Sequence, residues 1–267
     1  MARKPQRKRK AEALTQTSPP IAPELTWLRV AYEFHTFTYR DPRTPQSSAP
    51  GLPVVSPTAV LLGIASTLFN LGLAAEARAF LGQAHLCRVV IDPPIGAVFF
   101  RAFHQLRRYI SDQNKGKKEK FKPNPRVGLT DINQGIREHA LVEGPIRVFV
   151  GVPEALAEPV KAALRNRDHF GTHDSLCSLV GDVETCSQPT NIGFLSPEQW
   201  QTRPPSARGA SIVTLARFRA PLRPAVGDRW WMAGGPETEL VPFLIQGTFT
   251  GTSRGKIFRK TRSPDMP

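Results

Sequence analysis

The chain has 267 residues, of which 40% are hydrophobic, and it carries a formal net charge of +14 with a pI near 10.3. It is long enough to bury a hydrophobic core, but no apolar run reaches the roughly 18 residues that a membrane-spanning helix needs. Three cysteines at scattered spacing form no disulfide framework, and no apolar segment follows the charged N-terminal stretch. Composition therefore argues against a membrane protein or a secreted disulfide-rich protein and favours the cytoplasm.

The positive charge is concentrated in three segments. Residues 1–10, 101–126 and 254–262 together carry a net charge of +18, which leaves −4 for the rest of the chain. Such an excess costs self-repulsion unless an anionic partner neutralises it, and basic arms on a near-neutral body favour nucleic acid as that partner. The alternative is that these tails and loops are simply solvated.

Taken in chain order, residues 1–24 are charged and then rich in Ser, Thr and Pro, which predicts a disordered basic tail. Aromatic and β-branched residues from Thr26 to Tyr39 predict a long first strand, and five prolines in residues 40–57 predict an irregular loop. A Ser-Pro pair then marks the start of a helix whose apolar residues recur at helical spacing and which stops at Gly72.

The next segments are less regular. Residues 74–85 predict a second helix, and residues 86–91 predict a strand. Residues 97–109 are apolar and then basic, and they fit either a helix or a strand. The run from about 110 to 128 is too polar and broken to pack, which predicts a mobile basic loop.

The pattern becomes regular again after this loop. Residues 145–152 predict a strand, residues 154–167 a helix that Pro159 starts or kinks, and residues 175–185 another strand. The resulting order is βαββαβ with an insertion, which predicts an α+β, ferredoxin-like domain at residues 25–189. Its helices would leave one sheet face free, where single-strand RNA binders of this kind place their ligand.

The remainder, residues 190–267, contains candidate strands at 210–218 and 240–250 with Pro- and Gly-rich connections. It predicts a smaller, β-rich C-terminal part that ends in a basic tail.

Three segments, in order, resemble parts of a known family. The first is FHTFTYRDPRTPQSSAPGLPVVSPTAVLLGIASTLFNLG, the second is IREHALVEGPIRVFVGVPEALAEPVKAAL, and the third is HFGTHDSLCSLVGDVE. These segments resemble parts of the fifth CRISPR-associated protein family, a branch of the RAMP superfamily. The first is similar to the family's N-terminal strand, loop and proline-headed helix. The second is similar to its Arg-containing approach to a strand and short helix, and the third to its turn and strand. Together they cover about half of the chain.

The resemblance implies an RNA-binding subunit of a type I CRISPR surveillance complex (Cascade). Such a subunit holds the 5′ handle of the crRNA and caps the backbone for crRNA-guided DNA recognition. The implied partners are crRNA, the backbone subunit and the large subunit, with target DNA reached indirectly or through the basic tail, and with no membrane.

A held RNA end needs phosphate contacts from Arg and Lys and aromatic surfaces for splayed bases. We predict Tyr39 and Phe37 as base-stacking candidates, with a core position as the alternative for Phe37. The glycines beside Arg254 fit either a loop that approaches phosphate or a plain hairpin with a basic tail. The predicted RNA-binding residues are Arg40, Arg43, Arg101, Arg107, Arg108, Lys115, Lys117, Lys118, Lys120, Lys122, Arg126, Arg137, Arg254 and Lys256.

The chain also contains candidate residues for RNA cleavage. One subtype of the family cuts precursor crRNA without metal, using Tyr, Lys and His, but the loop before the proline-headed helix lacks the corresponding Tyr here. His35, Tyr39, Tyr109 and His139 remain acid–base candidates. A metal-independent endoribonuclease and a generic basic RNA-binding protein are therefore the alternative functions.

We expect no metal and no cofactor. His169, His173, Cys177 and Cys186 are candidate zinc ligands, but the Phe-Gly-Thr sequence after His169 breaks the helix that would align them. No glycine-rich phosphate fingerprint, hydrolase nucleophile elbow or pair of carboxylates at catalytic spacing is present.

Overall fold

The computed structural model describes residues 24–43, 49–109, 130–171, 175–190, 192–202, 209–222, 237–252 and 255–261. Its helices are α1 (Pro57–Asn70), α2 (Ala74–Gln83), α4 (Ala157–Arg165) and α5 (Pro197–Thr202), with a 3₁₀ turn, η1, at Glu154–Leu156. Its strands are β1 (Leu25–Phe34), β2 (Arg88–Asp92), β3 (Gly96–Tyr109), β4 (Thr130–Glu143), β5 (Ile146–Pro153), β6 (Cys177–Cys186), β7 (Phe194–Leu195), β8 (Ala210–Phe218), β9 (Thr238–Gln246), β10 (Thr248–Thr252) and β11 (Gly255–Arg259). Within these residues, no helix is long and apolar enough to cross a membrane.

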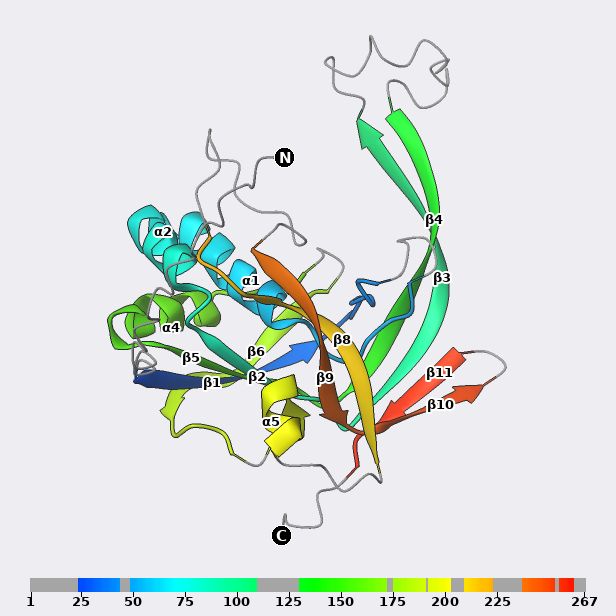
Figure 1. Cartoon of the computed structure of the whole chain (residues 1–267). Coiled ribbons are helices and arrows are strands. Elements are labelled where there is room, and N and C mark those ends of the chain that lie inside the picture. The colour runs from blue at the N-terminus through cyan, green and yellow to red at the C-terminus, as the bar shows by residue number, and fades with distance from the viewer. Residues whose placement is uncertain are drawn as a thin grey trace, which may run out of the picture.

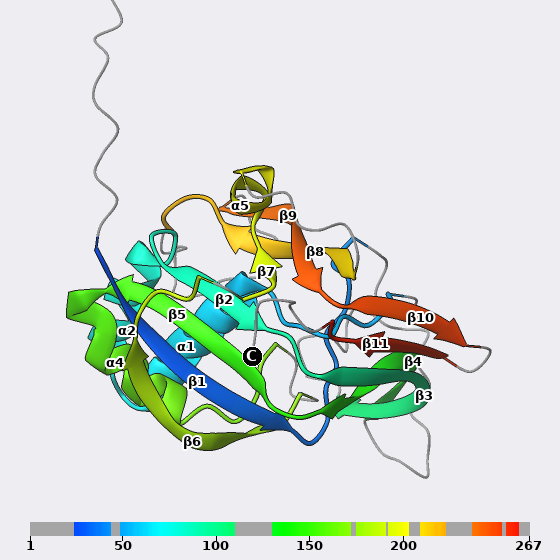
Figure 2. The same ribbon diagram turned by 90° about the horizontal axis from the view of Figure 1, so that it is seen from below.

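Four strands form an antiparallel sheet in the order β2-β5-β1-β6. Because α1 connects β1 to the β2 side and α4 connects β5 to β6, this is the strand order of a ferredoxin-like βαββαβ unit. The predicted α+β fold class is therefore confirmed. Helices α1, α2 and α4 lie behind the sheet in Figure 2, and the opposite face of the sheet is turned toward the viewer.

Helix α1 begins and ends where its sequence indicates. The Ser56 hydroxyl accepts a hydrogen bond from the Ala59 N–H at 3.1 Å, and Pro57 occupies the first helical position. At the other end, Gly72 adopts a φ of 78° and its N–H donates to the Phe69 carbonyl, while the Leu73 N–H reaches back to Leu68. This Schellman arrangement satisfies the last carbonyls of the helix and requires a left-handed residue, which glycine supplies.

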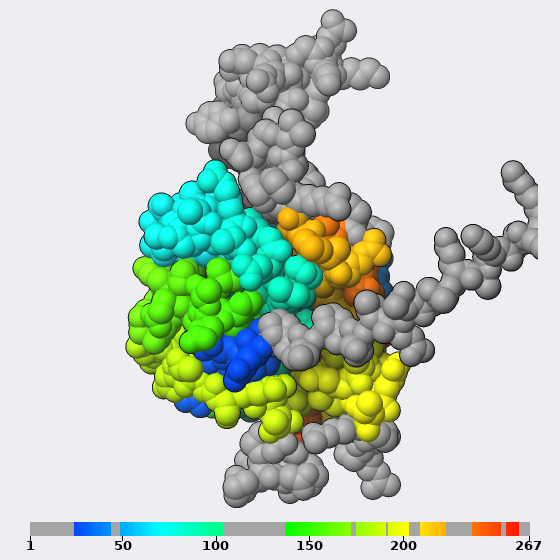
Figure 3. All heavy atoms as spheres, turned by 60° about the vertical axis from the view of Figure 1, so that its left-hand side comes forward, coloured from blue at the N-terminus to red at the C-terminus, as the bar shows by residue number. Residues whose placement is uncertain are grey.

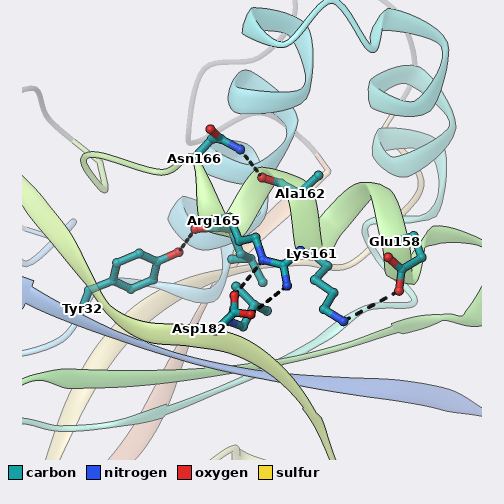
Figure 4. A network of polar contacts seen from close by, with 9 residues as sticks. Tyr32, Glu158, Lys161, Ala162, Arg165, Asn166 and Asp182 are labelled. Atoms are coloured by element: carbon teal, nitrogen blue, oxygen red, sulfur yellow. Dashed lines mark hydrogen bonds and ion pairs between the residues drawn. The ribbon is translucent and has the colours of Figure 1, made fainter.

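Helix α4 is fixed to the sheet by polar contacts that Figure 4 shows. The Tyr32 hydroxyl of β1 donates to the Leu164 carbonyl at 2.6 Å, and the Arg165 guanidinium binds both oxygens of Asp182 on β6 at 2.7 and 2.9 Å. Hydrogen bonds from Arg165 lower the pKa of Asp182 to about 2. The helix begins two residues before Pro159, so that Pro159 lies in the first turn, where an N–H has no intrahelical partner.

A long hairpin is inserted between β2 and β5. Its strands β3 and β4 pair residue by residue from Gly96↔Glu143 to Tyr109↔Thr130, and β11 and β10 extend the same sheet in the order β10-β11-β3-β4. Residues 97–109, predicted as helix or strand, are thus a strand. Strand β4 was not predicted, because its apolar residues are sparse and its partner is known only once β3 is in place. The predicted mobile loop at 110–128 lies outside the described residues.

The first strand is shorter than predicted. The sheet pairing of β1 ends at Phe34, and the chain then makes isolated bridges from Phe37 to Ala140 on β4 and from Arg40 to Gly51. The aromatic run therefore crosses from one sheet to the other instead of forming one strand to Tyr39.

The predicted strand at 240–250 is two strands that belong to two different sheets. Strand β9 lies between β7 and β8, and after Gly247 the chain enters β10, which pairs with β11. Gly247 adopts a φ of 146°, and a Cβ atom at this position would overlap the ring of Phe258. A residue without a side chain is therefore required where the chain changes sheets.

The sheets share one hydrophobic core. Leu28 of the ferredoxin-like sheet, Ile64 of α1, Phe99 of the hairpin and Leu215 of β8 all belong to one contiguous cluster of buried side chains. The base of the hairpin is therefore packed against the same core as the helices.

Replacement of Gly247 by Ala should destabilise the protein by about 2–4 kcal/mol, since it combines an unfavourable φ with a clash against Phe258. Urea unfolding followed by circular dichroism measures this loss. Gly251→Ala is the matched control, because no atom lies within 4 Å of the place that its Cβ would occupy. Equal stability of the two variants would contradict the assigned chain path.

Candidate nucleic-acid interface

A largely buried carboxylate joins three segments at the base of the hairpin. Glu138 on β4, whose side chain is 11% exposed, accepts a hydrogen bond from the Gly51 N–H and lies 3.3 Å from the ammonium of Lys256 on β11. Lys256 also donates to the Gly51 carbonyl at 2.6 Å and lies over the rings of Phe99 and Phe249 at 4.6 and 5.3 Å. We call this group the Glu138 clamp. It fixes the loop before α1 to the hairpin.

The segment after β1 is held on both sides. The Thr38 N–H donates to the Ser175 hydroxyl, which in turn donates to the Thr38 carbonyl, both at 3.0 Å. The Thr38 hydroxyl lies 2.9 Å from Nδ1 of His139 on β4, and the Leu52 N–H donates to the Tyr39 carbonyl at 2.7 Å. The predicted contact residues that follow are therefore carried on an anchored piece of chain.

Two of these predicted RNA contacts, Arg40 and Arg43, differ from each other in exposure and in the groups that they contact. Arg40 is partly buried and bridges to Gly51 through its backbone. Arg43 is exposed, and its guanidinium makes bidentate contact with the buried Asp41, with Nη2 at 2.6 Å and Nε at 3.0 Å. The hydrogen bond from Arg43 lowers the pKa of Asp41. Asp41 thus orients the Arg43 side chain within the loop.

The predicted stacking residues at the end of β1 are not open aromatic faces. Phe37 is fully buried and packs edge to face against Phe34 with ring centroids 4.9 Å apart. Of the two predicted roles for Phe37, the structure therefore shows the core position. Tyr39 is partly buried, its hydroxyl interacts with Ser56, and burial raises its pKa. Stacking by Phe37 is therefore a wrong prediction, because no face of the ring reaches solvent.

Exposed aromatic side chains lie on β3 instead. Phe103 is 65% exposed and Phe100 is 40% exposed, with the Phe100 ring stacked on His139 of the neighbouring strand at 5.9 Å. The sequence carried a signal for Phe100, since alternate residues of a strand face opposite sides and a buried Phe99 places Phe100 on the outer face, whereas Phe103 lies on the same face as Phe99 and its exposure is not predicted by alternation. The signal was missed because residues 97–109 were not assigned to a strand.

Four predicted arginines lie on the hairpin. Arg101 on β3 is 74% exposed and lies 3.9 Å from Glu138, and Arg137 on β4 is partly buried. Arg107 and Arg108 occupy the far end of β3, opposite Ile132 and Asp131. The hairpin projects away from the rest of the fold in Figure 1. The predicted residues outside the described part of the chain are Lys115, Lys117, Lys118, Lys120, Lys122, Arg126 and Arg254.

Lys256, a predicted RNA contact, is engaged within the fold. Its side chain is 23% exposed and its ammonium is already hydrogen-bonded to Gly51 and paired with Glu138. The glycines around it belong to the β10–β11 hairpin, so the plain-hairpin alternative describes this region. Lys256 therefore acts first as an internal counter-ion.

The two histidines among the acid–base candidates make different contacts. His35 bonds through Nε2 to the Ser178 hydroxyl of β6 at 2.7 Å, whereas His139 bonds to Thr38 and stacks on Phe100. Tyr109 ends β3, and its side chain lies outside the described atoms.

The two cysteines among the candidate metal ligands lie far apart, whereas His169 bridges to Leu176 beside the start of β6. Cys177 and Cys186 are the two ends of β6, which at about 3.3 Å per residue places them roughly 30 Å apart. His169 lies 2.6 Å from the Asp168 carboxylate, and His173 lies outside the described residues. Burial raises the pKa of the Cys177 thiol to about 12. In the described ranges, no three His, Cys, Asp or Glu side chains are grouped to hold a metal.

Comparisons with known proteins add little to this geometry. No family model matches the chain, and no curated protein matches it. Among solved structures, it is similar to the crystal structure of a CRISPR protein from Archaeoglobus fulgidus, with 14% sequence identity, a TM-score of 0.38, and coverage of 89% of this chain and 92% of that chain. The ferredoxin-like assignment rests on the strand order and pairing described above.

Lys256→Ala should lower the free energy of unfolding by about 2–3 kcal/mol, because it leaves the largely buried carboxylate of Glu138 without its nearer cation and with Arg101 at 3.9 Å. Lys161→Ala is a matched control, since Lys161 pairs at 3.9 Å with an exposed Glu158 and should cost less than about 0.5 kcal/mol. Urea unfolding of both variants measures the difference. An unchanged stability for Lys256→Ala, together with weaker RNA binding, would instead assign Lys256 to the RNA.

Proposed function

We propose that this chain binds single-stranded RNA along the β3–β4 hairpin. The observation that carries the proposal is a projecting, two-stranded arm with exposed Arg101 and Phe103 that leads into the most basic internal stretch of the sequence. Guanidinium groups bind the phosphate backbone, and exposed rings stack with unpaired bases. Both kinds of group are present on one strand.

The length of the arm suits a strand of RNA. Arg101, Arg107 and Arg108 are spread over eight residues of β3, and the seven intervals between residues 101 and 108 span roughly 24 Å at about 3.4 Å each. The clamp at Glu138 and the core packing of Phe99 anchor the base from which this span extends. A rigid base with charge along its length fits a partner that is itself extended and anionic.

We further propose that the RNA is the 5′ handle of a crRNA and that the protein is a subunit of a type I CRISPR surveillance complex. The supporting observation is the place of the three segments that resemble the fifth CRISPR-associated family. Residues 34–72 lead from the end of β1 to the end of α1, residues 136–164 contain the end of β4, β5 and most of α4, and residues 169–184 contain most of β6. Most of the helices and strands in these segments therefore belong to the ferredoxin-like unit. On this proposal the backbone and large subunits are its protein partners.

Replacement of Arg101, Arg107 and Arg108 together by Ala should weaken RNA binding and flatten its salt dependence. Each lost phosphate contact on a single strand reduces the slope of log K against log salt by about 0.7, so the triple variant should lose about 2 units. Fluorescence anisotropy with a labelled single-stranded RNA, repeated over a series of salt concentrations, measures this slope.

The control is an equal loss of charge on the body of the protein. Arg29 and Arg78 are exposed on β1 and α2, and Lys161 on α4 has a loose ion pair with the exposed Glu158, so all three lie away from the hairpin and do not fix the fold. Their triple Ala variant should bind RNA with a nearly unchanged slope. An equal reduction in both variants would mean that RNA responds to net charge alone, and the hairpin would lose its assigned role.

A further inference from the structure

The outer face of the sheet at the base of the hairpin is apolar and open. This sheet has the strand order β10-β11-β3-β4, and it lies on the opposite side of the molecule from α2 and α4 in Figure 1 and in Figure 2. Val98 and Phe100 on β3 are 43% and 40% exposed, and Leu141 on β4 is 60% exposed. Ile95, also 60% exposed, lies beside Gly144 at the end of β4. We call Ile95, Val98, Phe100 and Leu141 the outer apolar face.

The strand pairing makes this face continuous. Directly opposite residues of antiparallel strands point to the same side of a sheet, and Val98 is opposite both Ile257 on β11 and Leu141 on β4. Ile257 is in turn opposite the exposed Thr250 on β10. Phe100 lies two residues after Val98 and therefore extends the same side. One row of side chains thus crosses all four strands.

The residues proposed to bind RNA lie on the other side of the same strand. Alternate residues of β3 point to opposite sides, so that Arg101 and Phe103 share the side of the buried Phe99. Val98 and Phe100 point away from that side. Strand β3 therefore presents one face with an exposed cation and one face that is apolar.

The charges at the border of the outer apolar face neutralise each other. Arg259 on β11 and Glu143 on β4 stand on either side of Gly96 in β3, and they form an ion pair across it. A Cβ atom on Gly96 would lie within 3 Å of both side chains, so the lack of a side chain there lets them meet. The row through Val98 contains no ionisable side chain. An anionic partner such as RNA therefore finds no cation in this row.

The helical side of the protein has no comparable surface. Figure 3 views that side, where α2 and α4 form the cyan and green surfaces. All residues of these two helices are described, and none of their large hydrophobic side chains is exposed. The apolar exposure at the hairpin base is therefore a local feature, and contiguous exposed apolar patches often mark contacts between proteins.

The size and charge of the outer apolar face argue against a second copy of this chain as its partner. Four strands about 4.8 Å apart and five residues at about 3.4 Å each give a footprint of roughly 300 Å², less than half of the roughly 800 Å² that each partner buries in a stable interface. Two copies with a formal charge of +14 each also repel one another. A different protein chain on the same RNA needs less contact area, because the RNA keeps it at a high local concentration.

We infer that the outer apolar face docks an apolar, uncharged surface of another protein chain that is bound to the same RNA. The inference rests on the proposed RNA binding for this tether, and it assigns the two faces of β3 to two different partners. The docked surface supplies aliphatic or aromatic side chains. It needs no hydrogen-bonding groups at its centre, since the backbone groups of β11 and β3 are paired on both sides within the sheet.

The test is hydroxyl-radical footprinting with mass spectrometry, which reports the solvent exposure of individual Phe, Leu and Ile side chains. It compares the purified full-length protein, the same protein with a single-stranded RNA, and the assembly that the tagged protein forms with RNA and other proteins in its native cells. Phe103 should lose reactivity with RNA alone. Phe100 and Leu141 should stay reactive with RNA and lose about fivefold in the assembly, because the centre of a protein interface excludes water. Ile212 on β8 is the matched control, since it is 59% exposed and belongs to a different sheet.

A substitution checks the same face. Leu141→Glu should reduce the amount of the partner protein in the assembly about tenfold, since it would bury an unpaired carboxylate. RNA binding by the purified variant should stay unchanged. Ile212→Glu is the control at nearly equal exposure, and circular dichroism confirms that both variants fold.

Protection of Phe100 and Leu141 by RNA alone, or in a dimer of the purified protein, would assign the face to RNA or to a second copy and overturn the inference. Unchanged reactivity of both side chains in the assembly, or an assembly that contains no other protein chain, overturns it as well. Protection of Phe103 by RNA in those cases would show that the RNA-binding proposal survives. Lack of that protection, with Phe100 and Leu141 covered by another protein, would instead count against the RNA-binding role of the hairpin alone.

Discussion

The carboxylate of Glu138 is the interaction on which the arrangement of the hairpin depends. It belongs to β4, and it draws together the Gly51 loop, the ammonium of Lys256 and, at 3.9 Å, the guanidinium of Arg101. A carboxylate that is 11% exposed needs such partners, because an unpaired charge at this depth is costly. The loop before α1, the hairpin and the last strands therefore meet at one point, and the hairpin has a fixed base.

This fixed base separates two kinds of positive charge. Lys256 and Arg43 are ion-paired with Glu138 and Asp41, whereas Arg101 is mostly exposed and precedes a strand and loop with further cations. The net charge of the chain does not distinguish these residues. Because Lys256 and Arg43 already have close carboxylate partners, we propose the RNA-binding role for the arm and not for every basic side chain nearby.

Local patterns predicted the parts of the fold that local physics decides. Ser56 and Gly72 mark α1 because capping and a left-handed stop are local requirements, and the alternation of residues 145–152 predicted β5. The failures concern pairing over distance: β4 needs β3 before it is recognisable, and the run through Gly247 changes sheets in a way that hydrophobicity does not reveal. Because this long-range pairing was not predictable, the sequence also did not show which aromatic side chains are buried by other strands. Phe37 is buried by Phe34 and β4, while Phe100 and Phe103 are exposed on a strand that the sequence left unassigned.

We propose that this chain holds the repeat-derived 5′ end of a guide RNA. The most direct measurement is co-purification of the tagged protein from its native cells, followed by sequencing of the bound RNA with mapped 5′ ends. The account predicts short RNAs that share one repeat-derived 5′ end, and their loss in the Arg101, Arg107 and Arg108 triple variant. Ribosomal fragments or RNAs with unrelated 5′ ends would contradict the handle-binding role and leave a basic RNA-binding protein without that specificity.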